Sequence, residues 1–304
     1  MLTSSRPVAK RHLAVAALAT AAIALTACAP TDEADTGTDS GSESSESPSE
    51  TAAADECTPD TMETVTDGTL TIATDDPAYE PWFVDNDPAN GEGYESAVAY
   101  AVAEQLGYTA EQVTWVKVPF NKVVQPGPKE FDFDVNQVSI TEPRRKAVDF
   151  SSGYYDVVQT VITNKGSAID GTTSVAELAD AKLGAQVGTT SYTAITDQIQ
   201  PSQDPAVFDT NDQAVQALKN GQIDGIVVDL PTAYFMTAVQ LDDGVIVGQL
   251  PLPDGEVEQF GAVLAKDSPL TACISTAVDA LREDGILDQI NQESLAQQGA
   301  PELT

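Results

Sequence analysis

The sequence is poor in histidine, in cysteine and in basic residues. Its 304 residues include one His, three Cys and 14 Lys or Arg against 48 Asp or Glu, which gives a formal net charge of -34. The single His12 lies near the N-terminus and no Cys-x-x-Cys pair occurs, so we expect no metal, no other cofactor and no histidine general base. So acidic a chain is a poor partner for nucleic acid or an anionic membrane surface.

Residues 1–27 have the pattern of a secretory signal. Arg6, Lys10 and Arg11 precede an apolar run over residues 13–25 that is too short and too rich in Ala to span a membrane stably. The run ends in Leu-Thr-Ala-Cys28, which resembles a bacterial lipobox, a motif whose Cys becomes the lipid-modified first residue of the mature protein. The resemblance implies an exported chain that is anchored through Cys28 to the outer face of the cytoplasmic membrane.

A tether is predicted over residues 28–67, where Ser, Thr, Ala, Gly, Asp and Glu predominate and neither basic nor aromatic residues occur. Such a composition buries too little apolar surface to offset the loss of chain entropy on folding. If Cys28 is lipidated, Cys57 and Cys273 remain in an exported protein, where disulfides persist. We expect a bridge between them, with two free thiols as the alternative.

The remaining chain alternates short strands with helices, which predicts an α/β fold. The first strand, helix and strand form a parallel unit that should be right-handed. Strands are predicted at 70–74, 113–118, 131–136, 157–164, 182–186, 206–209, 223–229 and 260–266, and helices at 95–106, 174–179, about 191–200, 211–219, 268–283 and 286–295.

The segment over residues 131–155, FDFDVNQVSITEPRRKAVDFSSGYY, combines a strand with a turn and a second strand. Thr141 has the features of a helix N-cap and Pro143 fits the first helical turn, which would hold Arg144 over the carboxyl end of the strand. The fork of donors on an Arg suits a carboxylate.

This segment resembles the bacterial family 3 solute-binding proteins, the polar amino acid receptors of ABC importers, which commonly read "DV…(T/S)IT.ER…VDFS.PYY" here. The resemblance implies that Ser139 and Arg144 hold the α-carboxylate of the ligand. It also places Asn136 and Gln137, which stand where many relatives have small residues, beside the ligand.

Three further motifs follow the order of the family. Residues 75–82, DDPAYEPW, are similar to the family's "TD..YPPF", so the resemblance implies that the loop lines the ligand's side-chain pocket. Residues 184–190, GAQVGTT, are similar to "GVQ.GTT" and imply a second contact with the α-carboxylate. The resemblance implies that the acid that ends the strand at 223–229 contacts the α-ammonium, whereas the local sequence alone favours a cap for the next helix. The residues placed at the ligand by these motifs are Asp76, Tyr79, Trp82, Gln186, Thr189, Thr190 and Asp229.

Together the motifs imply the two-lobe, type II fold of periplasmic binding proteins. One lobe would comprise residues 68–159 and 253–304 and the other residues 160–252, joined by two hinge crossovers around a ligand. Within this pattern, Pro126-Gly127-Pro128 interrupts a helix that the family usually has.

The resulting hypothesis is a monomeric lipoprotein that captures a polar L-amino acid and delivers it to an ABC permease in the membrane. Asn136, Gln137 and Gln186 favour an uncharged ligand such as glutamine, whereas Asp75, Asp76 and Glu80 favour a basic one. Two alternatives remain at this point: a dehydratase on the same fold, acting on a cyclic carboxylic acid, and a receptor module that reports ligand to a sensor.

Overall fold

The computed structural model describes residues 57–252, 255, 257–295 and 299–304. The predicted signal, Cys28 and the predicted tether up to residue 56 lie outside the described residues. The prediction of a tether as far as residue 67 is wrong for its last part. Met62 is buried, and the Val65 N–H donates a hydrogen bond of 2.7 Å to Asp132 Oδ1. Residues 57–67 therefore belong to the folded part of the chain.

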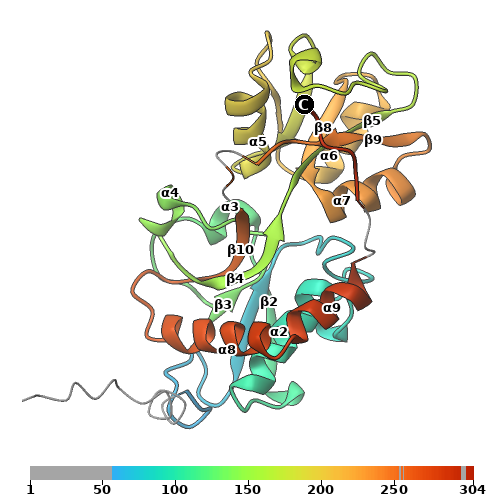
Figure 1. Cartoon of the computed structure of the whole chain (residues 1–304). Coiled ribbons are helices and arrows are strands. Elements are labelled where there is room, and N and C mark those ends of the chain that lie inside the picture. Colours follow the sequence, from blue (N-terminus) through green and yellow to red (C-terminus); the bar gives the residue numbers. More distant parts are fainter. Residues whose placement is uncertain (1–56, 253–254, 256, 296–298) are drawn as a thin grey trace, which may run out of the picture. The chain divides into compact units, whose positions relative to one another are not determined.

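The first sheet has five strands in the order β2-β1-β3-β10-β4 (Figure 1). The strands are β1 (Leu70–Thr74), β2 (Val113–Lys117), β3 (Phe133–Asp134), β4 (Asp149–Val157) and β10 (Glu258–Leu264). Strand β1 runs parallel to β2 and β3, whereas β10 runs antiparallel to β3 and β4. Strand β3 is shorter than predicted, because the chain leaves the sheet before Gln137, whose backbone is left-handed at φ 48.

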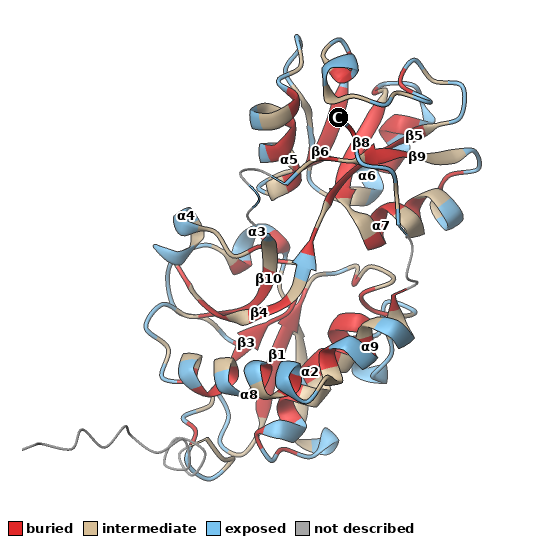
Figure 2. Ribbon diagram, in the orientation of Figure 1, coloured by how far each residue is buried: buried red, intermediate tan, exposed pale blue. Residues whose placement is uncertain are grey.

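Helices α2 (Tyr94–Gln105), α8 (Thr271–Glu283) and α9 (Ile286–Ser294) pack against one another along this sheet (Figure 1). Their buried faces join the sheet in one apolar core, drawn in red in Figure 2. Shorter helical segments lie at Pro88–Asn90, Ala110–Gln112, α3 (Phe120–Val123) and α4 (Glu142–Arg145). Helix α8 begins three residues later than predicted, and its N-cap is Leu270, whose N–H donates to Ser268 Oγ at 3.3 Å.

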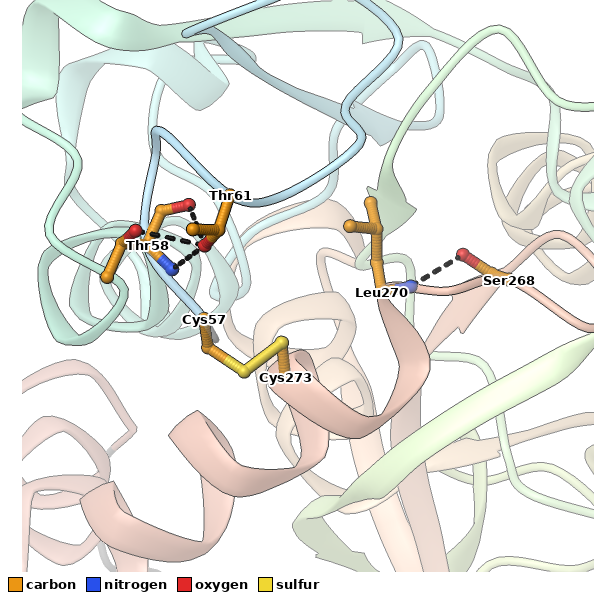
Figure 3. Close-up of a disulfide and its surroundings, with 6 residues drawn as sticks. All are labelled: Cys57, Thr58, Thr61, Ser268, Leu270 and Cys273. Atoms are coloured by element: carbon orange, nitrogen blue, oxygen red, sulfur yellow. Dashed lines mark hydrogen bonds between the residues drawn. A yellow bond between two sulfur atoms is a disulfide. The ribbon is translucent and has the colours of Figure 1, made fainter. Parts of the chain in front are cut away.

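A disulfide joins Cys57 to Cys273 of α8, with the two Cα atoms 5.4 Å apart (Figure 3). The predicted bridge is thus confirmed. It fixes the first described residue of the chain to a helix that packs on the first sheet, and Thr58 and Thr61 form a hydrogen-bonded turn directly after it.

The second sheet also has five strands, in the order β7-β6-β8-β5-β9. They are β5 (Gln159–Asn164), β6 (Leu183–Gln186), β7 (Ala206–Phe208), β8 (Gly225–Asp229) and β9 (Gly244–Gln249). Its helices are α5 (Thr190–Ala194), α6 (Asn211–Lys219) and α7 (Leu230–Phe235), with short helical segments at Val175–Leu178, Ile195–Ile199 and Met236–Gln240. Among the described residues, no helix is long and apolar enough to cross a bilayer.

The chain passes from the first sheet to the second between β4 and β5, and returns between β9 and β10. The two sheets with their helices form the two predicted lobes. The end of the chain differs from the prediction, which placed all of residues 253–304 in the first lobe. Leu303 is buried in the core of the second lobe, and its N–H donates to Gln249 O at 2.8 Å. The C-terminal residues therefore add to the edge of β9.

Candidate ligand-binding site

A cavity is lined by residues of both lobes, and small-molecule sites occur preferentially at such interfaces between domains. Many of the lining residues stand where parallel strands end, at the carboxyl edges of β1, β3, β6 and β8. Ligands of open α/β sheets bind at such edges. The lining residues are Asp75, Tyr79, Phe120, Asn136, Gln137, Ser139, Arg144, Gln159, Gln186, Thr189, Thr190, Ser191, Asn211, Val227, Val228, Asp229 and Phe260.

Arg144 is held in the cavity wall by α4, which begins as predicted with Thr141 as its N-cap. Its guanidinium lies 5.5 Å from the centre of the Phe120 ring and donates to Ser139 O at 2.6 Å and to Gly188 O at 2.8 Å. Burial lowers the pKa of Arg144 to about 10, so the side chain is a cation at neutral pH. In the described chain, no carboxylate lies within 4.0 Å of it. Its charge is therefore available to an anion.

Beside Arg144, the carboxylate of Glu258 accepts hydrogen bonds from both lobes. The hydroxyl of Ser139 donates to it from the first lobe, and that of Thr190 donates from the second at 2.5 Å. The amide of Gln159 lies 3.3 Å from both carboxylate oxygens and is itself oriented by Ser191, whose hydroxyl donates to Gln159 Oε1 at 2.8 Å. This cluster is a ready-made carboxylate site.

Thr189 and Gln186 connect the end of β6 to α5. Thr189 is the N-cap of α5, accepting from Tyr192 N at 3.3 Å, and its hydroxyl donates to Gln186 O at 2.8 Å. The backbone of Gly188 between them is left-handed at φ 74, which suits a glycine. The tight turn brings Thr190 to the cavity.

Asp229 ends β8 and caps α7, with Thr232 N–H donating to Oδ1 at 2.9 Å and Thr232 Oγ donating to Oδ2 at 2.8 Å. Trp82 Nε1 in turn donates to Thr232 Oγ1 at 2.9 Å, which connects the two lobes. Burial raises the pKa of Asp229 to about 6, although the bonds from Thr232 oppose the rise. Asp229 therefore combines the two interpretations, since it is both a helix cap and an acid in the cavity wall.

The loop after β1 brings Asp75 and Tyr79 to the cavity. Asp75 accepts from Phe120 N at 3.3 Å, and burial raises its pKa. The Tyr79 hydroxyl accepts from Asp212 N of α6 at 3.4 Å, a further contact between the lobes, and burial raises its pKa to about 12.

Buried polar groups lie under the first-lobe side of the cavity. Glu95 of α2 accepts from Gln137 N at 2.7 Å and from the Tyr154 hydroxyl at 2.5 Å, and burial raises its pKa to about 7. Among the described residues, the oxygens of Asp134 and Nδ2 of Asn136 have no hydrogen-bond partner. Burial raises the pKa of Asp134 well above its usual value. The unpartnered amide of Asn136 is a donor for a ligand, since Asn136 lines the cavity.

All predicted ligand residues line the cavity except Asp76 and Trp82. Asp76 is exposed and pairs with Lys117 at 2.9 Å, because adjacent side chains of an extended segment point apart and Asp75 faces inward. Trp82 is fully buried, edge-on to the rings of Tyr155 and Phe260. Both placements correct the prediction.

Sequence reasoning also missed several residues. Gln159 stands in a strand that also carries Thr160, Thr163 and Asn164, so its type does not single it out, and Glu258 stands in a segment without a distinctive pattern. Phe120, Ser191 and Phe260 line the cavity and were not predicted. Within the part of the chain that the structure describes, no cluster of three or more His, Cys, Asp or Glu is placed to hold a metal ion.

The chain matches the bacterial extracellular solute-binding proteins, family 3, over residues 70–297. It is 26% identical over 212 residues to the arginine-binding extracellular protein ArtP of Bacillus subtilis, covering 66% of this chain and 76% of that protein. It is 28% identical over 208 residues to the glutamine-binding protein GlnH of the same organism, covering 67% of this chain and 73% of that protein.

Among solved structures, the fold is similar to an ancestral amino acid-binding protein, AncCDT-1, described as a precursor of cyclohexadienyl dehydratase. The TM-score is 0.61 and the identity 28%, covering 75% of this chain and 95% of that one. The predicted α/β, two-lobe, type II fold is thereby confirmed. With both the family match and the fold in agreement, the chain belongs to the bacterial extracellular solute-binding proteins, family 3.

Proposed function

We propose that this protein is the substrate-binding lipoprotein of an ABC importer and captures a polar L-amino acid between its lobes. One observation carries the proposal: a cation of the first lobe, Arg144, and an acid of the second, Asp229, line the same cavity. A zwitterionic amino acid has a carboxylate to pair with Arg144 and an ammonium group to pair with Asp229. Because it contacts both lobes, its binding favours the closed form that a permease would recognise.

Two ligand classes fit the lining. Arg144 is the only basic side chain among the described lining residues, whereas Asp75 and Asp229 are acidic, and this balance favours a basic amino acid. The amides of Asn136, Gln137 and Gln186 favour glutamine. The names of the two Bacillus relatives, one for arginine and one for glutamine, support the same two classes.

The binding test is calorimetry of the full-length protein against the standard amino acids. We expect a Kd near micromolar, about −8 kcal/mol. Arg144→Ala should weaken binding by about 10- to 150-fold, since a hydrogen bond to a charged group contributes about 1.5–3 kcal/mol. Arg145→Ala is the matched control, because Arg145 is exposed and does not line the cavity.

Capture of leucine or isoleucine in preference to polar amino acids would contradict the proposal, and so would equal binding by the Arg144→Ala and Arg145→Ala variants. The same samples test for catalysis. A binding protein returns its ligand unchanged after prolonged incubation, whereas loss of water from a bound cyclic carboxylic acid would indicate a dehydratase.

Membrane attachment through Cys28 is tested separately. Replacing Cys28 by Ala should release the protein from the membrane fraction while leaving amino acid binding unchanged, because the acyl chains, and no part of the cavity, provide the anchor. A Cys28→Ala protein that stays in the membrane fraction would refute the anchor. Loss of uptake on deletion of a neighbouring permease gene would support transport rather than sensing.

A further inference from the structure

We propose that Glu258 is an internal competitor for the ligand, and that its side chain occupies the carboxylate site until an amino acid displaces it. The inference rests on the proposed function and on the family motifs, whose resemblance implies that Ser139, Thr190 and Arg144 hold the ligand's α-carboxylate. In the structure the first two already donate to a carboxylate, and it belongs to Glu258.

The donors around Glu258 form a built site. Ser139 and Gln159 are buried side chains with 1% and 7% exposure, so their polar atoms require partners within the protein or from a ligand. Gln159 is turned toward Glu258 by the hydroxyl of Ser191, and Arg144 provides a favourable electrostatic environment for a negative charge there. Three donors from both lobes, Ser139, Thr190 and Gln159, thus converge on one carboxylate.

A ligand carboxylate and Glu258 cannot both use these donors. Each hydroxyl has a single proton to donate, and both are directed at Glu258. Two carboxylates sharing one site also repel each other. Binding of an amino acid in the assigned orientation therefore requires the Glu258 side chain to leave, and capture becomes an exchange of one carboxylate for another.

Glu258 also links the lobes in the absence of ligand. Ser139 follows β3 in the first lobe, whereas Thr190 begins α5 in the second, and their hydroxyls lie 3.0 Å apart beside the shared carboxylate. Glu258 itself begins β10, where the chain has just returned from β9. Its carboxylate thus stabilises an empty closed form, and the observed affinity equals the intrinsic affinity multiplied by the fraction of molecules outside that form.

The test compares full-length wild type with Glu258→Ala, which removes the acceptor, and Glu258→Gln, which keeps the size and removes the charge. Glu283→Ala is the control, because Glu283 is an exposed acid in α8 outside the cavity. Small-angle X-ray scattering of the ligand-free proteins measures the separation of the lobes, and calorimetry measures binding of the amino acid that wild type prefers.

We expect ligand-free Glu258→Ala to have a larger radius of gyration than wild type and the control, and to bind the amino acid at least about tenfold more tightly, equivalent to about 1.4 kcal/mol. Glu258→Gln should lie between Glu258→Ala and wild type in both measurements. An unchanged radius of gyration, or unchanged or weaker binding, would overturn the inference.

The two proposals fail in different ways. If wild type binds an amino acid and Glu258→Ala binds it no better, the competitor is refuted and the proposed function stands. If neither protein binds any amino acid, the proposed function fails. The scattering comparison then still decides whether Glu258 holds the lobes together.

Discussion

Replacing Asp229 by Asn should stabilise the ligand-free protein and weaken its binding of an amino acid. The raised pKa means that the folded protein holds the Asp229 proton more tightly than the unfolded chain does. Wild-type stability therefore falls as the pH rises from about 4 to about 6 and stays lowered above that pH. A rise from 3.8 to about 6 corresponds to about 3 kcal/mol, at 1.36 kcal/mol for each tenfold change in proton affinity.

Asn is as good a helix N-cap as Asp, so the cap of α7 should survive the substitution. At pH 7 the variant should gain up to about 3 kcal/mol, which raises Tm by roughly 6–12 °C for a chain of this size. At pH 4 the gain should be near zero, because Asp229 of the folded wild type is then protonated. Thermal denaturation of the ligand-free protein at the two pH values measures the difference.

Binding should change in the opposite direction. Loss of the charge that faces the ligand's ammonium group should raise the Kd by about 10- to 150-fold, from a contribution of about 1.5–3 kcal/mol. Wild-type affinity should fall about tenfold for each pH unit below 6, and this dependence should be absent in Asp229→Asn. Asp224→Asn, just before the other end of β8 and outside the cavity, is the control. Equal effects of pH on both variants, or a stability gain that is the same at pH 4 and pH 7, would refute the reasoning.

Three further predictions concern stability and are measured by urea denaturation. Gly93→Ala should lower the free energy of unfolding by more than about 1 kcal/mol, because Gly93 has φ 91 and a Cβ there would lie 2.5 Å from Trp82 O. Gly91→Ala, with φ 77 and no atom nearer than 4.0 Å, should lower it less. The reverse order would contradict this explanation. Cys273→Ser should lower the free energy of unfolding by about 5 kcal/mol, from the chain entropy that a bridge across 216 residues removes. Adding Cys57→Ser should lower it no further. An additional loss of similar size would mean that the two cysteines act separately. Leu303→Ala should lower the free energy of unfolding by about 2–5 kcal/mol, since Leu303 is 2% exposed. Leu252→Ala, at an exposed position, should change it little. Similar losses in the two variants would argue that the C-terminal residues do not pack on the second lobe.

Local sequence patterns were sufficient for most elements of the fold. The helix at 95–106 and the strand at 113–118 lie within one residue of α2 and β2. The cap at Thr141 followed from the residue types that satisfy free N–H groups. Arg144 and Asp229 were implied by the resemblance of their motifs to the family, and both line the cavity.

Features that depend on distant contacts were not predictable in this way. Residues 57–67 resemble the preceding tether in composition, yet the disulfide and the burial of Met62 fix them to the first lobe. Which of two adjacent acids, Asp75 or Asp76, faces the cavity depends on the geometry of the loop. Glu258 carries no local signal at all, since its partners Ser139 and Thr190 lie more than 60 residues away in the sequence.

The C-terminal residues also limit how far the protein can open. Leu295 is buried in the core of the first lobe, while Pro301 accepts a hydrogen bond from Gln249 N in the second. The chain between these two residues reaches at most about 22 Å when fully extended, at about 3.6 Å per residue. A wider separation of the lobes would break the contacts of the last residues with β9. A shortened chain that ends at Leu295 should therefore open to larger interlobe angles than the intact protein.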